Sequence, residues 1–152
     1  MTDTPINVLV LCTGNSARSV LGECLINRLG AGKWKAFSAG SHPTGRVNPL
    51  SIEVLKEKGY ATEGLRSKSW DEFALPDAPK MDLVITVCDN AAGEVCPIWP
   101  GHPAKVHIGF PDPAHAKGTH EERLAEFRKI YDMIETKVRK LIEVGPARAG
   151  EV

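Results

Sequence analysis

Residues 6 to 19 read INVLVLCTGNSARS, and this stretch decides how the rest of the chain must fold. It opens with a continuous apolar run from Ile6 to Leu11, rich in β-branched residues and typical of a strand buried on both faces of a parallel sheet. The next residues, from Thr13 to Ser19, are small and polar, which indicates a loop. From Val20 the apolar residues recur at helical spacing as far as Gly30, a typical helix C-cap. A buried strand, a tight loop and a helix are therefore predicted in succession.

The rest of the chain alternates between strand and helix patterns in the same way. Further strands are predicted at 34–37, 81–87 and 106–108. Further helices are predicted from Asn48-Pro49 to Gly59, over 70–73, and from the capping box of Thr119 and Glu122 to Gly145-Pro146. This order predicts an α/β fold, a three-layer sandwich with a mainly parallel sheet. We expect a single domain over residues 1–152, with its core at about 6–144 and frayed final residues.

The composition argues against several classes of protein. Nineteen basic and nineteen acidic residues cancel, so no overall field attracts nucleic acid or an anionic membrane. The apolar runs are far too short to span a bilayer, and the first residues lack the pattern of a signal peptide. We therefore expect a cytoplasmic monomer. In that reducing compartment, thiol chemistry or burial explains the four cysteines better than structural disulfides do: Cys12, Cys24, Cys88 and Cys96.

The loop after the first strand has the chemistry of an oxyanion cradle. Its backbone N–H groups converge, the helix that follows adds partial positive charge, and Gly14 permits unusual dihedral angles. Five residues separate Cys12 from Arg18, so the guanidinium can return over the mouth and bind two oxygens of one ligand. The same donors stabilise the Cys12 thiolate, and Ser19 can donate a further hydrogen bond to it. The predicted oxyanion-binding residues are Thr13, Gly14, Asn15, Ser16, Ala17, Arg18 and Ser19.

This loop, in its strand and helix context, resembles the phosphate-binding loop of the low-molecular-weight protein tyrosine phosphatase family. The resemblance covers nearly the whole chain, from Val8 to about Ile142. It implies a four-stranded parallel sheet flanked by helices, with the active site at the carboxyl end of the first strand. It also implies that Asp112 acts as general acid, although Asp112-Pro113 on its own indicates only a turn.

A second segment separates two activities within this family. Residues 88–97 read CDNAAGEVCP and follow the third predicted strand, a pattern that resembles the arsenate reductases of the same fold. The resemblance implies that Cys12 attacks arsenate, that Cys88 then attacks Cys12 and releases arsenite, and that Cys96 moves the disulfide to Cys88. Phosphate and sulfate are expected as analogues of arsenate. We expect no tightly bound cofactor and an external thiol reductant, either thioredoxin or a glutathione, glutaredoxin or mycothiol system.

The competing activity is hydrolysis of phosphate monoesters by a tyrosine phosphatase, which needs only Cys12, Arg18 and Asp112. Against it, Ala114 stands where tyrosine phosphatases of the family carry an aromatic residue beside the substrate ring. A non-enzymatic phosphate-binding module is a third reading, but it leaves the central cysteine without a role. Burial alone is the alternative explanation for the two cysteines of residues 88–97.

Two further residue sets complete the predictions. Some relatives bind a potassium ion through an asparagine, a glutamate and a serine, a pattern that Asn15, Glu23 and Ser38 match. Hydrogen bonding of Asn15 within the loop is the simpler explanation. Cys24 falls on the apolar face of the first helix, which favours burial over chemistry.

Overall fold

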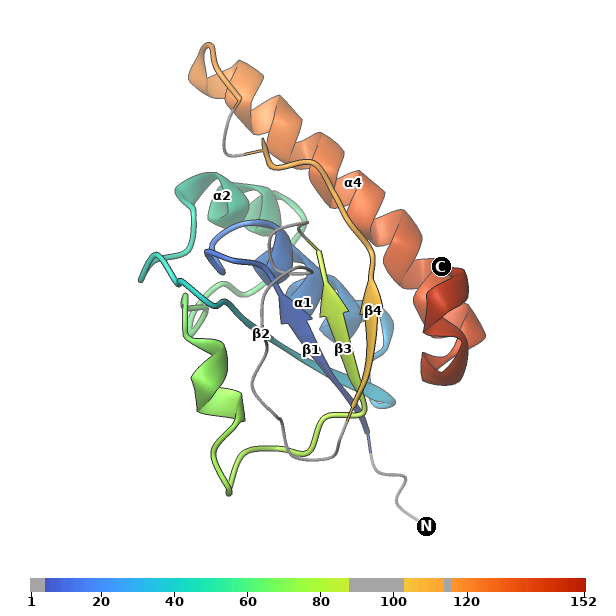
Figure 1. Ribbon diagram of the computed structural model, residues 1–152. Coiled ribbons are helices and arrows are strands. Elements are labelled where there is room, and N and C mark those ends of the chain that lie inside the picture. The colour runs from blue at the N-terminus through green and yellow to red at the C-terminus, as the bar shows by residue number, and fades with distance from the viewer. Residues whose placement is uncertain (1–4, 88–102, 114–115) are drawn as a thin grey trace.

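The computed structural model describes residues 5–87, 103–113 and 116–152 of the chain. A four-stranded parallel sheet in the order β2-β1-β3-β4 lies at its centre (Figure 1). Its strands are β1 (Ile6–Leu11), β2 (Trp34–Ala39), β3 (Leu83–Thr86) and β4 (Ala104–His107). Leu11 is in register with both Ala39 and Thr86, so three strands end at the same edge. The predicted four-stranded parallel sheet is confirmed.

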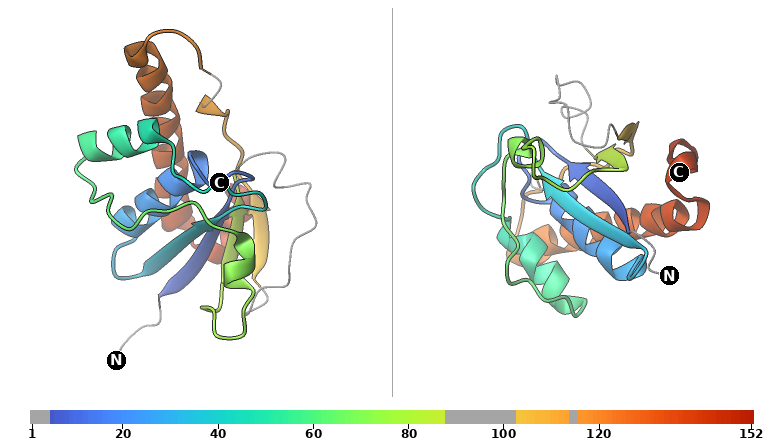
Figure 2. Two further views of the ribbon diagram at one scale, coloured as in Figure 1. Left: turned by 90° about the vertical axis from the view of Figure 1, so that its left-hand side faces the viewer. Right: turned by 90° about the horizontal axis from the view of Figure 1, so that it is seen from below.

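Both faces of β1 are buried, as its apolar run predicted. Val8 and Val10 belong to the larger core, which includes residues of α1 (Arg18–Leu29), α2 (Pro49–Glu57) and α4 (His120–Val144). Leu9 and Leu11 point to the opposite face, where the 3-10 helix η1 (Trp70–Phe73) covers them. Figure 2 shows this division of the helices between the two faces of the sheet.

Local capping signals set the helix ends. The Asn48 side chain accepts a hydrogen bond from the Leu50 N–H at the start of α2. Thr119 and Glu122 form both hydrogen bonds of the predicted capping box, and Gly145 ends α4 with a φ of 85°. Helix α1 begins at Arg18, two residues before the apolar pattern starts.

Several predicted boundaries were wrong. Strand β2 continues to Ala39, β3 is shorter than 81–87, and β4 begins two residues earlier than expected. The final residues are not frayed: Pro146–Glu151 form the 3-10 helix η3, in which Ala149 is buried. An ion pair joins Arg148 to Glu151 at 2.6 Å and stabilises this last turn.

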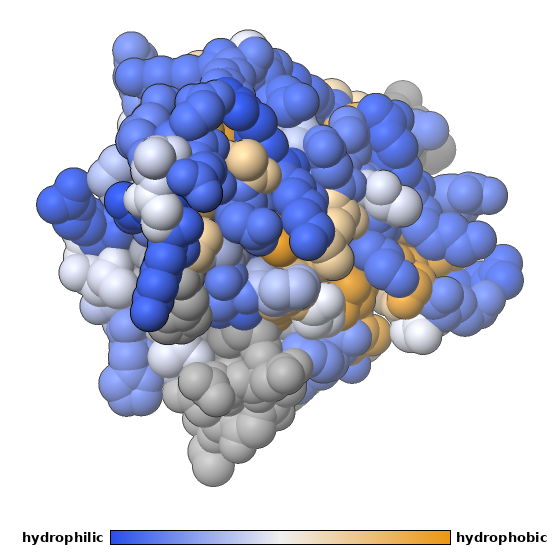
Figure 3. Space-filling view, turned by 90° about the horizontal axis from the view of Figure 1, so that it is seen from above, coloured by the Kyte–Doolittle hydropathy of each residue, from blue (hydrophilic) through white to orange (hydrophobic). Residues whose placement is uncertain are grey.

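The surface is mainly polar. The face shown in Figure 3 is mostly hydrophilic, with small hydrophobic areas between polar side chains. Within the described ranges, the large apolar side chains that are exposed are Leu75 and Met133. In that same part of the chain, no helix combines the length and hydrophobicity needed to cross a bilayer.

Candidate active site

The predicted cradle lies between the end of β1 and the start of α1, at the carboxyl edge of the sheet. Cys12, which directly follows β1, is only 5% exposed. Ala17 caps α1 without a side-chain hydrogen bond, whereas side chains cap α2 and α4. The first turn of α1 also lacks the acidic residues that stand in the first turn of α4. The first N–H groups of α1 therefore keep their capacity to bind an anion.

Asn15, rather than Gly14, makes the left-handed turn of the loop. Within the described residues it is the one non-glycine residue with positive φ, at 46°, and it is fully buried. Its Nδ2 donates to Ser19 Oγ at 2.8 Å, and its Oδ1 accepts from the Lys68 N–H at 2.9 Å. Because Ser19 Oγ accepts this bond, its own proton can be donated elsewhere. The expectation that Gly14 supplies the unusual dihedral was wrong; a Cβ there would instead lie 3.3 Å from Thr44 Cγ2.

Hydrogen bonds from neighbouring segments hold the loop carbonyls on the outside of the cradle. The acceptors are the carbonyls of Thr13, Gly14 and Ser16. Their donors are the backbone N–H groups of His42, Thr44 and Asn48 at 2.8–3.0 Å, together with Ser67 Oγ, which also donates to Gly14. In a trans peptide the N–H points opposite to the C=O, so each of these bonds turns an N–H toward the centre of the loop.

Gly40 lets the end of β2 pack against the cradle, a role that no sequence motif indicates. A Cβ at this position would lie 2.3 Å from the Thr13 carbonyl oxygen and 2.5 Å from that of Cys12. Both clashes involve backbone atoms, which cannot rotate away. The available signal was a glycine directly after the strand that neighbours β1.

Arg18 and Asp112, both predicted to act in the site, lie next to each other. Arg18 Nη1 donates to the Phe110 carbonyl at 3.0 Å, and Nη2 lies 3.5 Å from Asp112 Oδ2. Arg18 Nε is buried and has no hydrogen-bond partner among the described residues. A buried guanidinium N–H without a partner is costly, and an anion that accepted its hydrogen bond would remove this cost.

Cys24 is a buried structural thiol, as predicted. It is 8% exposed. Burial, with a smaller contribution from the Glu23 carboxylate, raises the pKa of Cys24 to about 12. The thiol therefore stays protonated at neutral pH and is a poor nucleophile.

Cys88, Cys96 and Ala114 lie outside the described residues. The chain leading to Cys88 is described. The Val87 N–H donates to the Leu11 carbonyl at 2.9 Å, and the Val87 carbonyl accepts from the Phe110 N–H at 3.1 Å. Val87 is thus bonded both to the strand that precedes Cys12 and to the segment that holds Arg18.

Of the three residues predicted to hold potassium, Glu23 and Ser38 are in contact, but their surroundings do not fit that ion. Ser38 Oγ donates to Glu23 Oε1 at 2.6 Å, and Lys68 Nζ lies 3.9 Å from the same carboxylate oxygen. A second cation beside this ammonium would be repelled. Elsewhere in the described chain no group of three or more His, Cys, Asp or Glu could hold a metal ion.

Known proteins share this architecture. The family model described as low molecular weight phosphotyrosine protein phosphatase matches residues 7–148. An arsenate reductase of Halalkalibacterium halodurans is 39% identical over 138 residues, which are 91% of this chain and 96% of that protein. The crystal structure of an arsenate reductase from Archaeoglobus fulgidus has a TM-score of 0.69 and 31% identity, covering 90% of this chain and 98% of that one. A solved arsenate reductase in the phosphate binding state has a TM-score of 0.66 and 26% identity, covering 91% and 97%. The resemblances drawn from the sequence are thereby confirmed, and the chain belongs to the low molecular weight phosphotyrosine protein phosphatase family.

Proposed function

We propose that this protein is an arsenate reductase, which converts arsenate to arsenite with electrons from thiols. The observation that supports this proposal most directly is the similarity of the chain to arsenate reductases over nine tenths of its length, with up to 39% identity. The geometry agrees with this assignment in two respects. Cys12 adjoins a loop whose carbonyls are held outward, and the buried Arg18 Nε has no hydrogen-bond acceptor among the described residues. A tetrahedral oxyanion satisfies both requirements.

In the first step, the cradle N–H groups and Arg18 bind arsenate, and the Cys12 thiolate attacks arsenic. A sulfur–arsenic bond forms as an arsenic–oxygen bond breaks. Asp112, held near the ligand by Arg18, supplies the proton with which that oxygen leaves as water. The Ser19 hydroxyl donates a hydrogen bond to the thiolate, since its oxygen already accepts from Asn15.

In the second step, the Cys88 thiolate attacks Cys12 Sγ. A disulfide forms between the two cysteines, the sulfur–arsenic bond breaks, and its electron pair reduces arsenic to arsenite. Cys96 then attacks Cys88, which restores the Cys12 thiolate and leaves a Cys88–Cys96 disulfide. In sequence, Val87 directly precedes Cys88 and Leu11 directly precedes Cys12. The hydrogen bond between Val87 and Leu11 supports the relay, because consecutive Cα atoms lie only about 3.8 Å apart.

The relay ends in a protein disulfide that an external reductant must open. Thioredoxin is the proposed reductant, and a glutathione, glutaredoxin or mycothiol system is the alternative. The scheme requires that the thiols be kept reduced between turnovers, which places the activity in the cytoplasm. Phosphate and sulfate would occupy the same cradle as analogues, and the protein would work without a tightly bound cofactor.

Single cysteine variants test the relay. Arsenite production is measured with thioredoxin, thioredoxin reductase and NADPH, and hydrolysis of p-nitrophenyl phosphate is measured in parallel. We expect Cys12→Ser to abolish both activities, and Cys88→Ser to abolish arsenite production while ester hydrolysis continues. Cys96→Ser should complete one turnover and then stop. Cys24→Ser is the matched control and should keep both activities, because its thiol is buried and protonated.

Two outcomes would overturn this proposal. Ester hydrolysis without arsenite production under any of the reductants would identify a phosphatase that uses Cys12, Arg18 and Asp112. Steady turnover of Cys96→Ser with thioredoxin would show that the third cysteine is unnecessary.

A further inference from the structure

Lys68 has an unusual position for a lysine. Its side chain is only 10% exposed, and its ammonium lies 3.9 Å from Glu23 Oε1, on a side chain that is 17% exposed. The same ammonium donates to the Arg66 carbonyl at 3.4 Å. Burial raises the pKa of Glu23 and lowers the pKa of Lys68, so the charge on each is costly unless the other is present.

The backbone of Lys68 is bonded to the cradle. Its N–H donates to Asn15 Oδ1 at 2.9 Å, and its carbonyl accepts from the Gly40 N–H at 3.0 Å. Asn15 makes the left-handed turn of the loop and donates to Ser19. Lys68 therefore contacts the site twice: its backbone N–H bonds to Asn15 of the loop, and its ammonium pairs with Glu23 of α1.

Charge balance explains why a cation is needed here. Glu23 lies four residues after Ser19 on α1, so the two side chains are neighbours on one helix face. An uncompensated carboxylate at this point would oppose both a nearby thiolate and a bound oxyanion. The Lys68 ammonium supplies the compensating positive charge.

We propose that Lys68 is a positioning residue. Its ammonium serves as the built-in cation of the cradle and neutralises Glu23 without a bound monovalent ion, while its backbone N–H holds Asn15 in its turn. The inference deepens the proposed function, since the cradle is the same. Its test uses binding of inorganic phosphate and the melting temperature, and neither depends on arsenate reduction. Failure of one proposal is therefore distinguishable from failure of the other.

The first experiment separates charge from packing. Lys68→Met keeps the aliphatic stem and removes the ammonium. We expect phosphate affinity to fall about tenfold, which is the loss typical of residues that orient the groups in direct contact with a ligand. Adding Glu23→Gln should restore most of that affinity, because both charges are then absent. Lys56→Ala, at an exposed position of α2, is the control for loss of a lysine and should bind normally. Normal binding by Lys68→Met, or a double variant as weak as the single one, would overturn the proposal.

The second experiment opens a place for an ion. Lys68→Ala removes the stem, and its melting temperature is compared in potassium chloride and choline chloride at equal ionic strength. We expect potassium to raise the melting temperature and phosphate affinity of this variant in a saturable way, and to leave the parent protein unchanged. Equal potassium effects on both proteins, or none on the variant, would contradict a built-in cation.

Discussion

Gly40→Ala should disable the cradle with a single methyl group. The added Cβ would lie 2.3 Å from the Thr13 carbonyl oxygen, and real Cβ atoms essentially never approach closer than 3.0 Å, so the backbone must move by at least about 0.7 Å. Gly40 cannot yield easily, because its N–H is bonded to the Lys68 carbonyl and its own carbonyl accepts from the Trp70 N–H. The loop that carries Cys12 is therefore expected to shift.

The magnitudes follow from these distances. Overpacking of this kind costs about 1–3 kcal/mol in the free energy of unfolding. For a chain of this size that corresponds to a fall of about 2–4 °C in melting temperature per kcal/mol. Misplacing a catalytic group by about 1 Å can cost about 100-fold in rate, and we expect a loss of that order in kcat/KM for the reactions that use Cys12.

The assay combines thermal melting with kcat/KM for arsenate reduction and for p-nitrophenyl phosphate hydrolysis, at a temperature where the variant is fully folded. Gly150→Ala is the matched control, because nothing lies within 4 Å of its added Cβ, and it should behave like the parent protein. A folded Gly40→Ala variant with normal kcat/KM would show that the cradle tolerates the displacement and would refute the reasoning.

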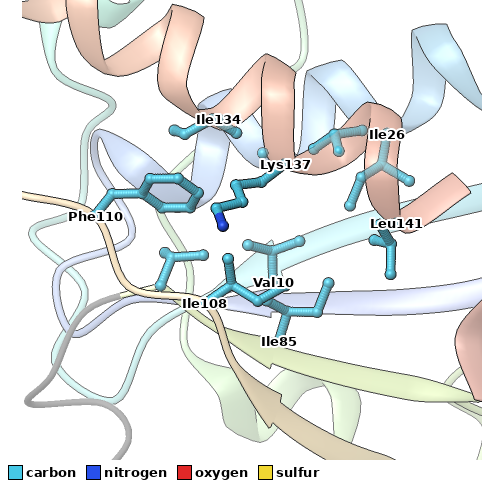
Figure 4. Close-up of a pocket in the computed structure, with 11 residues that line it drawn as sticks. Val10, Ile26, Ile85, Ile108, Phe110, Ile134, Lys137 and Leu141 are labelled. Atoms are coloured by element: carbon cyan, nitrogen blue, oxygen red, sulfur yellow. The ribbon is translucent and has the colours of Figure 1, made fainter. Parts of the chain in front are cut away.

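Three other predictions concern stability. Gly22→Ala should raise the melting temperature, since alanine is favoured over glycine inside a helix by about 0.5–1 kcal/mol. The Cβ of the new alanine would lie 3.2 Å from Val10 Cγ1. Val10 and Gly22 both line a small cavity of about 20 Å³ beneath α4 (Figure 4), into which the Val10 side chain can move. A lower melting temperature would show that Val10 cannot move in this way. Cys24→Ser should lower stability by about 1–3 kcal/mol, the cost of a buried hydroxyl without a partner, and denaturant melts that match the parent would contradict this. Glu57→Gln should lower the melting temperature slightly at neutral pH, because the Arg128 guanidinium lowers the pKa of Glu57 from its ordinary value of 4.5. Stability from a depressed carboxyl pKa is present above the unfolded pKa and is lost in acid, so the difference between the two proteins should close as the pH falls well below 4.5; a difference that persists in acid would rule out the ion pair as its source.

Local chemistry explains which parts of the fold were predictable. The apolar run of β1 and the helix caps at Asn48 and Thr119 depend only on residues that are close together in sequence. The structure has all three where the sequence predicted them. The start of α1 was missed because Ala17 gives no side-chain cap. The same missing cap leaves the N–H groups at this end available to the proposed oxyanion site.

The site was predictable where a motif carried it. Cys12, Arg18 and their spacing mark the cradle, and the family resemblance added Asp112, which does lie beside Arg18. Gly40 and Lys68 could not be found in this way. Lys68 meets Asn15 across 53 residues of chain, and no local pattern marks a residue whose role arises only when distant segments pack.

The outward-held carbonyls of the cradle also make the site a late product of folding. Their donors come from the segment 42–48 and from Ser67, and Arg18 is tied to Phe110 across 92 residues of sequence. Closing such long loops is slow and entropically costly, so these bonds form only once the overall topology is in place. A short peptide carrying residues 12–19 should have little affinity for phosphate, and recovery of anion binding during refolding should report the completed fold rather than its first helices.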